Sequence, residues 1–263
     1  MSRQQLFVVG TAIFLFLGLY FGCNTKPQEQ KIVEKARSLT LESTDVKSLV
    51  RNAKDSLSVA ERSEVMTVEA ALNAAKSDAD KVEQFKLLSQ KWYQFGNAAV
   101  AGHYAEEIAT IENTEQAWSI AGTTYSIAVQ RTKVEKIREF CANRAIRAFE
   151  NAISINPTNT THQVNLALCY TEYPLKENPM KGIQMLLELN KKDPKNISVL
   201  NTLARLGLQT GQYEKAAKRL EVVLSLDANN QKATCLLAQA YQGLGNTDKA
   251  AAFNNKCQLL QQK

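Results

Sequence analysis

The sequence predicts an all-α fold in which helical hairpins are stacked in series and preceded by an N-terminal transmembrane helix. The chain of 263 residues contains only 11 Gly and 5 Pro, whereas strand-rich folds use these residues at their many turns. Hydrophobic residues make up 44% and charged residues 22%, so the chain can bury a core and is not a disordered polyampholyte. Near the C-terminus, similar residues recur at an interval of 34, which indicates a repeat architecture.

The N-terminal segment is predicted to be a membrane anchor. Residues 1–5 form a short tail, and the following 17 residues, 6–22, carry no charge. As a helix this segment spans about 25 Å, slightly less than a hydrocarbon core of about 30 Å. Two alternatives are a cleaved secretory signal and a lipoprotein signal that ends at Cys23 as the lipidation site. Phe21 and Tyr20 stand where a lipoprotein signal usually has a small and a leucine-like residue, which argues against the second alternative.

The polar residues 23–44 are expected to form a tether between the anchor and the body. Four basic residues between positions 26 and 37 follow the anchor, which by the positive-inside rule favours a cytoplasmic body. Conversely, a very short tail with Arg3 as its one basic residue is typical of a bacterial signal-anchor that exports the rest of the chain. We predict a single-pass protein of the bacterial inner membrane with its body in the periplasm.

Residues 45–111 are predicted to form helices that precede the regular repeats. Ser58 and Glu61 form a capping-box pattern, which marks the start of a helix. A degenerate hairpin is also expected in this range. Its first helix would contain Trp92, Phe95, Gly96 and Ala99, and its second helix residues 103–111.

A regular spacing of glycines and prolines marks the C-terminal half. Gly211 and Gly245 are 34 residues apart, whereas Pro157 and Pro194 are 37 apart. The longer spacing predicts three extra residues in one turn.

The residues between these marks make the pattern specific, and they resemble the tetratricopeptide repeat family. In the first unit the matching residues are Trp118, Gly122, Tyr125, Ala145, Phe149, Ala152 and Pro157. In the later units they are Ala167, Tyr170, Pro194, Ala204, Gly211, Ala216, Ala238, Tyr241, Gly245 and Ala250. The resemblance implies four stacked helix pairs at residues 112–159, 160–196, 197–230 and 231–263, with the first hairpin extended. Such a fold by itself indicates almost nothing about the function of the protein.

The resemblance also implies that the first helices of the pairs line a groove for a partner peptide or helix. The groove positions carried over by register are Ser119, Thr123, Val164, Asn165, Leu168, Asn201, Arg205, Cys235 and Gln239. This surface is mixed in polarity and not strongly charged. Some members clamp the C-terminal carboxylate of a chaperone with five Lys, Asn and Arg side chains. Only Asn165 or Lys232 matches, depending on the register, which argues against that partner.

The net charge of +6 arises in the last third of the chain. Residues 180–263 contain 12 Lys and Arg against 6 Asp and Glu, and the remainder sums to zero. No arginine-rich, aromatic or glycine-rich element accompanies this charge, so nucleic-acid binding is not expected. Solvated lysine-rich helices and an acidic partner surface both fit the asymmetry.

The sequence contains no recognisable catalytic constellation. His103 is predicted in a turn after Gly102, and His162 has no second metal ligand at helical spacing. Phosphate loops, nucleophile elbows and zinc-protease motifs do not occur. We expect no enzyme activity, cofactor, metal or small-molecule substrate. A bridge between Cys235 and Cys257 is conceivable in an exported body, although helix packing need not bring their Cα atoms within bridging distance.

These observations predict a membrane-anchored, non-catalytic adaptor or scaffold that binds partner proteins. The chain resembles single-anchor repeat proteins of the bacterial cell envelope, which implies a role in the assembly or maintenance of an envelope complex. The alternatives are an envelope holding chaperone or translocon accessory for exported chains, and a lipoprotein anchored through Cys23.

Overall fold

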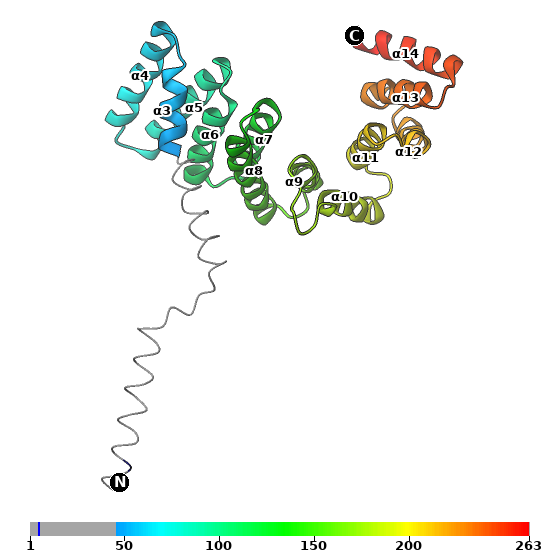
Figure 1. Ribbon diagram of the computed structural model, residues 1–263, viewed down its shortest axis with the longest axis horizontal. Helices are drawn as coiled ribbons and strands as arrows, with labels where there is room; N and C mark the ends of the chain where they lie inside the picture. Colours follow the sequence, from blue (N-terminus) through cyan, green and yellow to red (C-terminus); the bar gives the residue numbers. More distant parts are fainter. Residues whose placement is uncertain (1–4, 6–45, 263) are drawn as a thin grey trace. The chain divides into compact units, whose positions relative to one another are not determined.

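The structure is a computed structural model that describes Gln5 and residues 46–262. Within this part of the chain it consists of 12 α-helices and no strands (Figure 1), which confirms the all-α prediction for the described residues. The described residues from Leu49 onward cluster as one compact unit. The helices are α3 (Val46–Asp55), α4 (Val59–Ala74), α5 (Asp78–Gln94), α6 (Ala98–Glu112), α7 (Glu115–Arg131), α8 (Glu135–Ile155), α9 (Thr160–Glu172), α10 (Lys181–Lys192), α11 (Ile197–Gln209), α12 (Tyr213–Leu226), α13 (Gln231–Gly243) and α14 (Thr247–Gln261).

The predicted anchor (residues 6–22), the tether (residues 23–44) and Cys23 all lie outside the described residues. Among the residues that are described, no helix combines the length and the apolar composition needed to cross a bilayer.

Local sequence explains where several helices begin. Ser58 caps α4 and forms the predicted capping box with Glu61, and Ser77 forms a second box with Asp80 at the start of α5. Asparagine side chains cap α6, α9, α11, α13 and α14 by accepting a hydrogen bond from a first-turn N–H group. These caps satisfy N–H groups that have no acceptor within the helix.

Successive helices pack as hairpins, which pair α5 with α6, α7 with α8, α9 with α10, α11 with α12, and α13 with α14. The longest pair is α7 and α8, with 17 and 21 residues, whereas α9 has 13 and α10 has 12. Tyr125 and Phe149 fill the space inside this long hairpin and are fully buried. Trp118 is only half-buried, and its indole N–H donates to Asn113 Oδ1 at 3.1 Å. Other buried residues of the repeat pattern are Gly122, Ala145, Ala152, Ala167, Tyr170, Ala204, Ala216, Ala238 and Tyr241.

One type of turn closes three of the hairpins. Gly96, Gly211 and Gly245 have φ angles of +79°, +72° and +72°, in the left-handed region that glycine tolerates best. After each glycine, the next N–H bonds to the carbonyl five residues back, as in Gln212 N to Gly207 O at 2.8 Å. This is the hydrogen bond of a Schellman motif. The prediction that Gly96 lies inside a first helix is therefore wrong, because α5 is the first helix and Gly96 begins the turn to α6.

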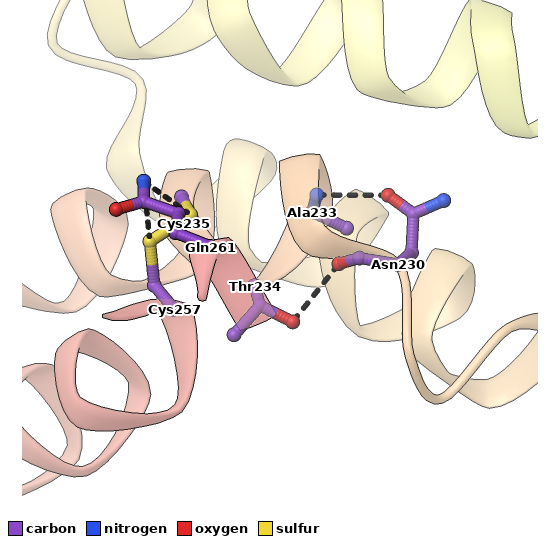
Figure 2. Close-up of a disulfide and its surroundings, with 6 residues drawn as sticks. All are labelled: Asn230, Ala233, Thr234, Cys235, Cys257 and Gln261. Carbon is purple, nitrogen blue, oxygen red and sulfur yellow. Dashed lines mark hydrogen bonds between the residues drawn. A yellow bond between two sulfur atoms is a disulfide. The ribbon is translucent and has the colours of Figure 1, made fainter. Parts of the chain in front are cut away.

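A disulfide joins the last two helices (Figure 2). Cys235 of α13 and Cys257 of α14 have their Cα atoms 5.0 Å apart, so the packing does bring these positions within bridging distance. The amide nitrogen of Gln261 lies 3.6 Å from Cys257 Sγ and 4.0 Å from Cys235 Sγ. Cys257 is the single buried residue of α14. The bridge therefore holds a helix that buries little surface of its own.

Candidate functional site

The candidate binding positions lie on α5, α7, α9, α11 and α13, the first helices of the hairpins. Two depressions lie between these helices. The α5–α7 groove is bounded by α5 and α7, with residues of α6 between them. The α7–α9 pocket is bounded by α7 and α9, with residues of α8 between them.

The α7–α9 pocket brings together three of the predicted groove residues, Thr123, Asn165 and Leu168. Its volume is about 120 Å³, and Phe149 forms part of its apolar wall. Cys169 also lines it, and burial raises the pKa of this thiol to about 11. The thiol is therefore protonated and unreactive at neutral pH. A pocket of this size and lining suits the insertion of one side chain of a partner protein rather than a catalytic reaction.

The α5–α7 groove is larger, with a volume of about 610 Å³. Two apolar side chains project into it from facing helices, Tyr93 of α5 and Ile120 of α7, which are 41% and 54% exposed. Ala105 and Ile108 of α6 lie between them. The remaining lining residues are Lys86, Ser89, Gln90, Gln94, Glu112, Thr114, Gln116, Ala117 and Thr124. Apolar anchors among amides and hydroxyls form the pattern of a site for a peptide-like ligand.

Charges in the α5–α7 groove are balanced within the groove itself. Lys86 Nζ lies 3.3 Å from Glu112 Oε1. The Arg131 guanidinium stands over the Tyr93 ring at 5.2 Å from its centroid, and Arg131 Nη2 donates to the Tyr93 hydroxyl at 3.4 Å. This cation–π contact orients the ring. Binding here would depend on apolar contacts and hydrogen bonds more than on net charge.

The sequence register missed this groove because it misplaced Gly96. In the third unit the groove positions Asn201 and Arg205 stand ten and six residues before the turn glycine. Counting back by the same intervals from Gly96 gives Lys86 and Gln90, and both line the α5–α7 groove. The left-handed turn glycine was the signal that could have identified them.

The other predicted groove residues line neither depression. Val164 and Asn201 are buried, and Ser119 and Arg205 are half-buried. The amide nitrogen of Asn201 lies 3.5 Å from Asn230 Oδ1, the cap of the next first helix. Cys235 is bonded to Cys257 and presents no thiol, while Gln239 is exposed.

His103 lies in the middle of α6 and not in a turn. A Cβ atom on Gly102 would come within 2.7 Å of the Tyr125 ring. The glycine therefore permits α6 and α7 to approach closely, and α6 continues through it. Burial lowers the pKa of His103 to about 4, so the imidazole is neutral at pH 7. It lies 3.7 Å from Glu107 and lines neither depression.

A buried carboxylate links α6 to α7 and α8. Glu106 accepts a hydrogen bond from the Tyr125 hydroxyl at 2.8 Å. The same carboxylate pairs with Arg144 at 2.8 Å and with Arg147 at 3.2 Å. The Glu106 carboxylate is thus held by three side chains of α7 and α8. We therefore interpret it as a structural group that stabilises the helices around the groove.

His162 belongs to a second polar cluster, between the start of α7 and the α8–α9 turn. Its Nε2 lies 2.6 Å from Glu115 Oε1, and Asn156 donates to Glu115 Oε2 at 2.8 Å. Asn159 also bonds to this carboxylate. Hydrogen bonds from Asn156, Asn159 and His162 hold the pKa of Glu115 below its ordinary value. Within residues 46–262, no group of three or more His, Cys, Asp or Glu side chains forms a candidate metal site.

Comparison with known protein families gives a match to part of the chain. Residues 207–263 match the tetratricopeptide repeat family. The matched range runs from the end of α11 through α12, α13 and α14, and it contains the turn glycines Gly211 and Gly245. It supports the resemblance for this part of the chain. No curated protein matches the chain.

Similar solved structures include a MamA protein with 16% identity and a TM-score of 0.43, covering 69% of this chain and 92% of that chain. MamA residues 41 to the end from Desulfovibrio magneticus RS-1 share 17% identity at a TM-score of 0.44, covering 72% and 98%. YrrB, described as a TPR protein with an unusual peptide-binding site, shares 13% identity at a TM-score of 0.40, covering 74% and 93%.

Proposed function

We propose that the chain is a non-catalytic scaffold that binds a partner protein in the α5–α7 groove. The observation that carries this proposal is the pair of exposed apolar side chains, Tyr93 and Ile120, on either side of a cavity of about 610 Å³. Tyrosine is among the residues that supply most of the binding energy at protein interfaces. The surrounding amide and hydroxyl side chains can form hydrogen bonds with the backbone of an extended segment of the partner. The α7–α9 pocket offers a further site for one side chain of the same segment.

We further propose that residues 6–22 anchor the chain in the bacterial inner membrane and that the body serves a cell-envelope complex in the periplasm. The bridge between Cys235 and Cys257 supports export, because disulfides persist in oxidising compartments such as the periplasm and are rare in the cytosol. Cys141 and Cys169 are buried, which protects them from mispairing there. If the anchor is instead a lipid on Cys23, the mass of the N-terminal peptide will include that lipid.

The experiment that tests the binding proposal compares three versions of the full-length protein in cells. Wild type, Ile120→Asp and Val222→Asp are treated with a chemical crosslinker, purified, and analysed by mass spectrometry. Val222 is the matched control because it is a comparably exposed aliphatic residue, 41% exposed on α12, that lies outside the groove. A desolvated carboxylate at position 120 would weaken apolar binding severely.

The expected result is one dominant partner that is lost with Ile120→Asp and retained with Val222→Asp. Equal recovery from all three versions would contradict the placement of the site in the groove. A broad set of exported chains in place of one partner would favour a holding chaperone. Recovery of cytosolic proteins alone would contradict the periplasmic location.

A further inference from the structure

A third depression opens between α10 and α12, on the other side of α11 from the predicted groove positions. We call it the α10–α12 cleft. Its volume is about 430 Å³. On α11 it is lined by Leu203, Leu206, Gly207, Gln209 and Thr210. Each helical residue advances about 100° around the axis, so Leu203, Leu206 and Thr210 lie opposite Asn201 and Arg205, whereas Gln209 lies about 40° from Arg205. The cleft is separate from the α5–α7 groove on which the proposed function rests, because no residue lines both.

The walls of the cleft are largely apolar and partly open to solvent. Met180, at the start of α10, is 54% exposed, and Leu187 on the same helix is 46% exposed. Ile183 lies between them on α10 and also lines the cleft. Exposed apolar side chains that converge on one depression are characteristic of an interaction site, whereas single exposed residues are ordinary.

One edge of the cleft is basic and not neutralised. Lys215 and Arg219 of α12 stand four residues apart on one face of the helix, and no Asp or Glu lines the cleft. Lys215 bonds to the Gln212 side chain at 3.3 Å, and no hydrogen bond or ion pair within the described residues holds Arg219. Burial lowers the pKa of Arg219 from its ordinary value. A half-buried guanidinium without an anion leaves a strong donor unused.

The surrounding segment has the same charge bias. Residues 181–226 contain eight Lys and Arg against four Asp and Glu. A partner that fills this cleft must therefore combine an apolar stripe with carboxylates at one edge, and an amphipathic helix presents such a stripe at every third or fourth residue.

We propose that the α10–α12 cleft is a second protein-docking site, which takes an acidic amphipathic helix of a partner. The apolar stripe of that helix lies on Met180, Ile183 and Leu187. Two of its carboxylates, one turn apart, pair with Lys215 and Arg219. The scaffold would then hold two partners at once, one in the α5–α7 groove and one in this cleft.

The test is a titration of full-length protein, in a nonionic detergent, into fluorescein-labelled synthetic peptides of about four helical turns. One peptide has Leu at every third or fourth position with flanking Glu, and its matched partner has Lys in place of each Glu. Fluorescence anisotropy is expected to show about tenfold tighter binding of the Glu peptide, with the difference reduced by salt.

The variants decide where and how the peptide binds. The double variant Lys215→Glu/Arg219→Glu should reverse the preference toward the Lys peptide, a result that a general loss of folding cannot produce. Lys218→Glu, on the same helix and outside the cleft, should keep the wild-type preference. Leu187→Ser should weaken binding of the Glu peptide, and Ile120→Asp should leave it unchanged.

Four results would overturn the proposal. The first three are equal affinities for the two peptides, an unchanged preference in the double variant, and binding to phosphatidylglycerol vesicles with no binding of either peptide. The fourth is loss of the peptide with Ile120→Asp, which would place it in the α5–α7 groove. The cleft proposal would then fail while the proposed function stood.

Discussion

Reduction of the bridge between Cys235 and Cys257 should release α14 from α13. The bridge closes a loop with a sequence separation of 22 residues, for which the chain-entropy relation gives about 3 kcal/mol at 25 °C. Cys257 is the single buried residue of α14, and Ala250 and Phe253 are partly buried against the core of α11, α12 and α13. The other contacts of α14 include the stacking of Phe253 on Tyr241, with ring centroids 5.7 Å apart, and the Lys249 ammonium group 4.8 Å from the centroid of the same Tyr241 ring. We therefore expect local opening of the last hairpin rather than unfolding of the whole array.

The assay is amide hydrogen exchange of the full-length protein with and without reductant. A loss of about 3 kcal/mol corresponds to roughly 100-fold faster exchange in α14, while α7 and α8 should change little. The double variant Cys235→Ser/Cys257→Ser is the control. It should exchange in α14 as reduced wild type does, with or without reductant.

Two results would refute this reasoning. Unchanged protection of α14 after reduction would show that packing alone holds the helix. Alkylation under denaturing, non-reducing conditions that labels both Cys235 and Cys257 would show that the bridge does not form in the cell. In that case the support from the bridge for an oxidising compartment would also be lost.

Three further predictions concern the scaffold. Because its folded-state pKa is depressed, the Glu115 carboxylate contributes stability above its unfolded pKa, and that contribution is lost as pH falls through the folded pKa. Denaturant melts from about pH 5 downward should therefore show the advantage of wild type over Glu115→Gln shrinking, and a constant difference would contradict this. Gly211→Ala forces an alanine into the left-handed region and should cost about 1 kcal/mol of unfolding free energy, seen as a lower denaturation midpoint. Glu106→Ala removes the carboxylate that pairs with the buried Tyr125 hydroxyl and the Arg144 guanidinium. It should lower the free energy of unfolding by about 3 kcal/mol. An unchanged free energy of unfolding would mean that solvent satisfies both groups.

Features that depend on neighbouring residues in sequence were predictable from the sequence. The capping box of Ser58 and Glu61 starts α4, and the glycines at 211 and 245 close hairpins. Tyr125 and Phe149, which the repeat pattern singled out, are buried inside the α7–α8 hairpin. Each of these signals acts within one or two turns of the chain.

Features that depend on distant residues were not predictable. Gly96 and Gly102 look alike in sequence, yet the first closes a turn and the second accommodates the ring of Tyr125 from the next helix. Asn201 was placed in a groove by register, but packing between successive units buries it. The α10–α12 cleft likewise depends on side chains from three helices that lie far apart in the sequence.

The most direct test of the central claim is photo-crosslinking in cells from a single photoreactive residue at position 120 or at position 222. The account predicts that a partner protein is captured from position 120, in the α5–α7 groove, and not from position 222 on α12. Capture of the same partner with equal yield from both positions would contradict it, because the contact would then not be confined to the groove.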